Sequence, residues 1–244
     1  MKQIYTYVDQ FPDLASKIHE SGNVTDGTNK QNCEAFKNSK LSTHDGKEKD
    51  FINKCTKIVN YNDKVAVEES SKTAYFEYIN YWLYDRLNDV NQFSHKELLD
   101  DFYNKIEKFS NCKTYKKYIN EEIYNELNEL YKLHEHLFKY KKGLTESSSD
   151  YCVHAKEGAE LYESRASKCK WNSYDYCSSL KQFRDEYEKY RSTDTKCSDH
   201  MQYLTPVGYN PEAYFLNATL AMSIITFVFI YFYKVCNYTI LKIF

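Results

Sequence analysis

The 244-residue sequence contains only six glycines and three prolines, and its basic and acidic residues nearly balance. An all-β domain uses glycine and proline at its many turns, so their scarcity argues against that class and favours helices joined by short links. With 33 basic and 35 acidic residues, the formal net charge is −2. Nucleic-acid binding needs a strong basic field, which this composition does not provide. We therefore expect no nucleic-acid partner.

Sequence signatures of catalysis and metal binding are also missing. The chain contains no Cys-x-x-Cys pair, no glycine-rich phosphate loop and no Gly-x-Ser-x-Gly elbow. The segment LHEHLF places His134 and His136 on different sides of a helix, and a zinc-protease pattern would need a histidine where Phe138 stands. Paired acids such as Glu121 and Glu122 are typical of a solvated helix face. The sequence thus predicts no catalytic residue, no cofactor, no metal site and no enzymatic activity.

One long apolar stretch lies near the C-terminus. From Ala213 to Tyr233 there is no charged side chain. A helix of this length rises about 31 Å, close to the hydrocarbon thickness of a bilayer. The alternative is a buried core helix, but such a helix normally keeps a polar stripe. The sequence therefore predicts a single membrane-spanning helix, and the membrane is the first expected partner.

This span divides the chain into four parts. We expect a helical ectodomain at 1–192, a stalk or linker at 193–212, the transmembrane helix at 213–233 and a short cytoplasmic tail at 234–244. The only charges after Tyr233 are two lysines, so the positive-inside tendency places the tail in the cytosol and the N-terminal domain outside. The N-terminus has no continuous apolar run of the kind found in secretory signals. The competing topology is a tail-anchored protein whose helical domain faces the cytosol.

Apolar residues recur at helical spacing along most of the ectodomain. Between residues 151 and 192 two sets advance in steps of three and four, which predicts two helices in a hairpin. A further pattern at 76–90 predicts a helix that contributes to the core. The core residues expected there are Tyr78, Ile79, Trp82, Leu83 and Leu87. Polar segments at 21–32 and 145–150 have the composition of exposed loops. The predicted fold is all-α, a multi-helix ectodomain of antiparallel helical hairpins followed by one transmembrane helix.

Eight cysteines are scattered along the chain, seven of them before the span. In an outward-facing domain they are expected to form disulfides. Cys152 and Cys169 lie about 25 Å apart on one predicted helix and cannot bond each other. Folding the hairpin instead brings Cys169 opposite Cys177 at its closed end and Cys152 near Cys197 at its open end. One of the seven stays free or pairs with another chain; the alternative for all of them is buried free thiols in a reducing compartment.

Several of these features together resemble a known family. The segment AYFEYINYWLYDRLND (74–89), with YINYWLYDRL as its central motif, is followed by scattered cysteines, a Tyr- and Lys-rich helical body and YNPEAYF (209–215) leading into the span. This arrangement resembles the PIR family, the Plasmodium interspersed repeat variant proteins, and within it the Vir-like branch from malaria parasites. The resemblance covers most of the chain.

The resemblance implies a function without catalysis. A member of this family is expected to be a variant surface antigen, exported to the infected red-cell membrane, that acts in immune evasion and adhesion. The implied partners are host cell-surface receptors and antibodies, and we expect antibodies to bind the loops at 21–32 and 145–150. The alternative function follows from the competing topology, namely a tail-anchored membrane protein acting in trafficking or membrane organisation.

Overall fold

The computed structural model describes residues 4–21, 27–40, 47–65, 68–88, 94–146, 151–169, 175–197, 199–208 and 211–241. All regular secondary structure in these residues is helical, which confirms the predicted all-α class. The first half comprises the 3-10 helix η1 (Val8–Gln10), α1 (Phe11–Glu20), α2 (Gly27–Lys40), α3 (Lys47–Tyr61), η2 (Asn62–Lys64), α4 (Glu69–Leu87) and α5 (His95–Lys105). The second half comprises η3 (Glu107–Phe109), η4 (Lys113–Tyr115), α6 (Glu121–Glu146), α7 (Tyr151–Ala166), η5 (Ser167–Cys169), α8 (Asp175–Arg191) and α9 (Pro211–Leu241).

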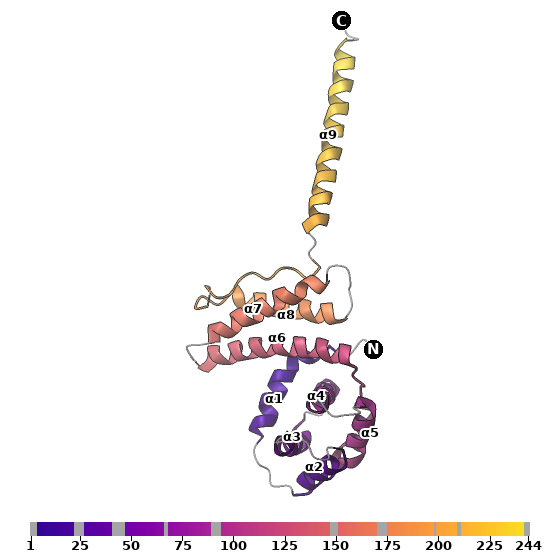
Figure 1. Ribbon diagram of the computed structural model, residues 1–244. Coiled ribbons are helices and arrows are strands. Elements are labelled where there is room, and N and C mark those ends of the chain that lie inside the picture. Colours follow the sequence, from indigo (N-terminus) through magenta and orange to yellow (C-terminus); the bar gives the residue numbers. More distant parts are fainter. Residues whose placement is uncertain are drawn as a thin grey trace.

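The long helix α6 separates two groups of helices. Figure 1 shows α1 to α5 clustered on one side of α6, while α7 and α8 lie on its other side. Helix α6 contacts α1 and α4 on the first side and α7 and α8 on the second. Helix α9 extends away from the α7–α8 layer, so the cluster of α1 to α5 lies farthest from it.

Helix α4 forms the centre of the larger cluster because its sequence is aromatic or apolar on nearly every side. All residues from Ala74 to Tyr84 are buried, and Leu87 is buried as well. Trp82 stacks on Phe51 of α3, with ring centroids 5.4 Å apart, and packs on Phe102 of α5 at 6.2 Å. A helix that is apolar all round has to be surrounded by others, which is why α1, α3, α5 and α6 pack around it.

The side chain of Asn80, inside this cluster, forms hydrogen bonds through both its nitrogen and its oxygen. The Asn80 amide donates to the carbonyl oxygen of Tyr115 at 2.9 Å, and its oxygen accepts from the Tyr103 hydroxyl at 3.1 Å. The His95 ring contacts the backbone oxygen of Asn80 at 3.3 Å, and the Ile119 N–H donates to its Nδ1 at 2.9 Å. These bonds link α4 to α5 and to the segment before α6, since an unpaired buried polar group would destabilise the fold.

Two segments predicted to be loops differ from that expectation. Helix α2 begins at Gly27, so the latter part of 21–32 is helical, and residues 22–26 lie outside the described residues. The polar composition is misleading there because Asn29 is buried and donates to Asn60 Oδ1 at 2.6 Å. Helix α6 likewise continues to Glu146, which shortens the second segment, and residues 147–150 lie outside the described residues.

Candidate functional site: a disulfide-linked module beside an apolar helix

Helix α9 carries the apolar stretch and exposes it from Phe215 onwards. The part from Phe215 to Lys234 is long and apolar enough to cross a membrane, and none of it is buried against the rest of the chain. Large apolar side chains along it are 46–73% exposed. The structure therefore rules out the alternative of a core helix, because a core helix would be covered by its neighbours. It agrees with a single membrane-spanning segment at the predicted place.

The helical hairpin next to α9 contains both disulfides that the sequence predicts. Cys169 and Cys177 are bonded at the end where η5 leads towards α8, with Cα atoms 5.7 Å apart. Cys152, at the start of α7, is bonded to Cys197, with Cα atoms 5.4 Å apart. By loop-closure entropy each bond stabilises the domain by about 2–4 kcal/mol.

The segment predicted as a stalk is packed against this hairpin over much of its length. We call residues 199–207 the strap. The Leu204 N–H donates to Glu188 Oε1 of α8 at 2.7 Å, and the Thr205 N–H donates to Glu163 Oε1 of α7 at 2.7 Å. The Leu204 side chain is fully buried. The strap thus closes the α7–α8 layer rather than standing free; the boundaries of the predicted domains stay predictions.

A third disulfide links α2 to α3 at the end of the molecule farthest from α9. Cys33 of α2 and Cys55 of α3 are bonded, with Cα atoms 6.0 Å apart, and both are fully buried. The sequence analysis did not predict this disulfide, although the two cysteines lie on consecutive helices. Cys112 is free and half-buried, and burial raises the pKa of its thiol. Six of the seven cysteines before α9 are therefore paired.

The five core residues predicted on α4 all lie in the hydrophobic core. Their side chains are at most 4% exposed: Tyr78, Ile79, Trp82, Leu83 and Leu87. Tyr78 packs on Phe11 with ring centroids 5.6 Å apart. The Trp82 Nε1 is buried without a hydrogen-bond partner among the described residues. The motif YINYWLYDRL (78–87) therefore contributes to core packing, and we assign no ligand to it.

One charged residue of α4 is also buried. The Glu77 carboxylate pairs with Lys117, while its second oxygen has no hydrogen-bond partner among the described residues. Burial raises the pKa of Glu77 to about 7, although the bond to Lys117 lowers it. The folded protein thus binds this proton more tightly than an unfolded chain does.

We expect Glu77→Gln to stabilise the domain more at pH 8 than at pH 5. Because the folded-state pKa lies above the ordinary value of 4.5, this residue's contribution to stability is lost as the pH rises through about 7. The two pKa values differ by the equivalent of about 3 kcal/mol. Thermal unfolding at both pH values measures the effect, with exposed Glu122→Gln as the control. An equal gain at both pH values would contradict the prediction.

A cavity of about 510 Å³ lies where η1 and α1 meet α6 and α8. His134 lines it; burial lowers the pKa of this histidine to about 3, so the ring is neutral, and its Nε2 has no hydrogen-bond partner among the described residues. Burial, and next the charge of Glu186, raises the pKa of Asp9. Lys141 pairs with Glu186 at 2.7 Å. Because Lys141 and Glu186 neutralise each other and the His134 ring is neutral, we assign the cavity no catalytic role.

His134 and His136 diverge, as the sequence predicted. His134 points into the packed side of α6 against the Phe183 ring, with centroids 5.5 Å apart. His136 instead faces α7, where its Nδ1 lies 3.3 Å from Glu157 Oε2. The His154 Nδ1 lies 3.4 Å from the same oxygen. Among the described residues, His136, His154 and Glu157 are the group whose side chains could hold a metal ion. Sequence reasoning overlooked the two residues on α7.

Comparison of the chain with protein-family models, with curated proteins and with solved structures gives no match. What the protein does has therefore to be inferred from its own residues and their geometry.

Proposed function

We propose that this protein is a membrane-anchored surface antigen whose helical domain is displayed outside the cell. The resemblance to the PIR family specifies the proposal further, as a Vir-like variant antigen of a malaria parasite at the infected red-cell membrane. Its roles there are immune evasion and adhesion to host receptors, without catalysis. The observation that carries the proposal is the set of three disulfides on the N-terminal side of α9.

Disulfides support display because of where they persist. They form and remain in oxidising compartments and are rare in the cytosol. All six bonded cysteines lie before the apolar helix, so one outward-facing domain accounts for all of them. This topology also leaves the two lysines that follow Tyr233 in the cytosol, in line with the positive-inside tendency.

The recognition surface that fits this proposal is the end of the molecule farthest from α9. Helices α2 and α3 lie there, and the bond between Cys33 and Cys55 ties them together. Exposed residues on these helices can vary at little cost because the buried side chains keep the packing. We infer that antibodies and receptors bind this end and the adjoining loops, while Trp82 and its neighbours act only through folding.

Protease added to intact cells tests the topology. We expect it to digest the chain before Glu212 and to leave a protected fragment that contains α9. A cytosolic reporter protein in the same cells is the control for membrane integrity. Protection of the whole chain in sealed cells contradicts display and favours the alternative, a tail-anchored protein that acts in trafficking or membrane organisation.

Peptide mapping without reduction tests the disulfides directly. Material alkylated at the moment of lysis should give linked peptides for Cys33 with Cys55, Cys152 with Cys197, and Cys169 with Cys177, and should carry alkylated Cys112. The same digest after reduction provides the unlinked reference masses. Four or more free thiols in surface material would remove the support that disulfides give to display.

A further inference from the structure

His136, His154 and Glu157 converge on one point between α6 and α7. Their ligand atoms all lie within 4.8 Å of one another. Two contacts are closer, since Glu157 Oε2 lies 3.3 Å from His136 Nδ1 and 3.4 Å from His154 Nδ1. Metal–ligand distances of about 2.0–2.2 Å in a tetrahedral zinc site place neighbouring ligand atoms about 3.3–3.6 Å apart. Both contacts therefore already have the spacing of a metal site.

The local sequence explains why the three side chains meet. His154 and Glu157 are three residues apart on α7, so they share one face of that helix. Gly158 lets α7 approach α6 closely, because a Cβ atom there would lie 3.3 Å from the Cβ of His136. A larger residue at this position would push the two helices apart. The close approach of the helices is what brings His136 within reach of the pair on α7.

The hydrogen bonding of the group is incomplete. The His154 Nδ1 hydrogen-bonds with Glu157 Oε2, but the buried His136 Nδ1 has no hydrogen-bond partner among the described residues. Lys139 of α6 and Lys156 of α7 are paired elsewhere, with Glu135 at 3.3 Å and with Glu160 at 3.8 Å. In the part of the chain that the structure describes, the ion pairs of Glu157 are thus with the two histidines. A cation bound by all three groups would satisfy each of them.

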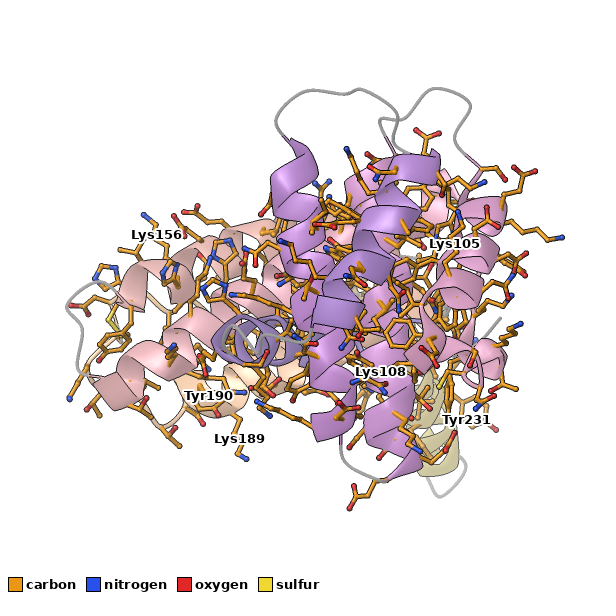
Figure 2. The ribbon with its side chains drawn as sticks, turned by 90° about the horizontal axis from the view of Figure 1, so that it is seen from below. Lys105, Lys108, Lys156, Lys189, Tyr190 and Tyr231 are labelled. Atoms are coloured by element: carbon orange, nitrogen blue, oxygen red, sulfur yellow. A yellow bond between two sulfur atoms is a disulfide. The ribbon has the colours of Figure 1, made fainter. Side chains whose placement is uncertain are left out.

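We propose that His136, His154 and Glu157 bind one zinc ion that links α6 to α7. Imidazole nitrogens with one carboxylate oxygen are ligands that zinc accepts in tetrahedral geometry, whereas calcium and magnesium prefer oxygen ligands alone. Three protein ligands leave a fourth position for water or for a side chain of another molecule. The site is reachable from solvent, because the side chains of His154 and Glu157 are 35% and 48% exposed. Figure 2 shows Lys156, on the same helix, at the outer edge of the molecule.

Zinc titration of the full-length, oxidised protein in detergent tests this site. The protein is first stripped of metal with a chelator, and its cysteines outside the three disulfides, Cys112 and Cys236, are alkylated, so that they do not compete for zinc. Calorimetry with zinc chloride should show one ion per chain. His154→Ala and Glu157→Gln should each weaken binding at least 10- to 100-fold, since changes that merely reorient a ligand already cost that much. Magnesium chloride should give no binding.

The matched control is His19→Ala, which removes an exposed histidine on α1 and should leave zinc affinity unchanged. His154 and Glu157 are 35% and 48% exposed, so their variants should keep the wild-type helical circular dichroism and disulfide map. A second readout is the thermal midpoint, which excess zinc should raise in the wild type and in His19→Ala but not in the two site variants. Absence of saturable binding, or equal binding by wild type, His154→Ala and Glu157→Gln, overturns the proposal. Neither result depends on which way the domain faces the membrane.

Discussion

A chain that ends at Glu212 should stay in the supernatant after alkaline carbonate extraction, whereas the full-length chain should stay with the membranes. Removing 213–244 deletes the whole exposed apolar face of α9. About 20 apolar residues match the bilayer thickness, and each Leu, Ile, Phe or Val at mid-membrane favours insertion by about 0.3–0.6 kcal/mol. The strap and all three disulfides precede Glu212, so the shortened domain should keep its fold. Immunoblots of pellet and supernatant measure the change.

The matched control is a chain that ends at Lys234, which keeps the span and loses only the residues after it. It should remain in the pellet like the full-length protein. A second control places two lysines in the middle of the span, Ile225→Lys with Val228→Lys, at a cost of about 2.5–3.5 kcal/mol each. Extraction of the full-length chain by carbonate, or retention of a folded chain ending at Glu212, would contradict anchoring by α9.

Trp82→Ala should destabilise the N-terminal cluster by about 3–5 kcal/mol, enough to unfold a marginally stable domain. The side chain is 3% exposed and lies between Phe51 and Phe102, so its loss leaves a cavity that the packed rings cannot close. Chemical denaturation followed by circular dichroism measures the loss. Antibody or receptor binding should fall in proportion to the unfolded fraction, because Trp82 contributes almost nothing to the exposed surface.

Trp82→Phe is the informative control for this position. It keeps a ring against Phe51 and removes the Nε1 donor that has no partner among the described residues. These two effects oppose each other, so we expect a cost below about 1.5 kcal/mol. A Trp82→Ala protein that keeps its stability but no longer binds antibodies would show that the motif takes part in recognition directly.

The sequence predicted the features that depend on strong local patterns. The apolar pattern around Trp82 predicted a core helix, and α4 is buried. The uncharged run up to Tyr233 predicted a membrane-spanning helix, and α9 is not covered by the rest of the chain. The hairpin disulfides were predictable because Cys169 and Cys177 flank a short connection, and the same fold brings the open end of α7 towards Cys197. Each of these inferences needed only helix geometry and spacing along the chain.

Features that depend on contacts between distant segments were not predictable in this way. The polar start of α2 has the composition of a loop. Asn29 can be buried there because it donates a hydrogen bond to Asn60, 31 residues later. The strap also has the composition of a linker. The glutamates that accept hydrogen bonds from its N–H groups belong to α7 and α8. Nothing in the composition of these segments indicates a partner so far along the chain.

The candidate metal group illustrates the same limit. His154 and Glu157 at a spacing of three were a readable signal on a predicted helix, but the third ligand is on α6. The zinc-protease pattern involves only His134 and position 138, which lie on the same helix as His136. Only the approach of α7 over Gly158 shows which residues His136 meets.

The bond between Cys152 and Cys197 also determines how the protein would carry mechanical force. In the proposed topology, a receptor bound to the distal helices would pull the chain against its anchor in α9, and tension from α9 would reach Cys197 once the strap had detached from α7 and α8. There the covalent path crosses to Cys152 and continues towards α6, bypassing α7, η5 and α8. The 45-residue separation of the two cysteines would otherwise release roughly 150 Å of slack chain. The disulfide therefore keeps the tether short, and the α7–α8 layer remains folded under a load that would extend an unlinked hairpin.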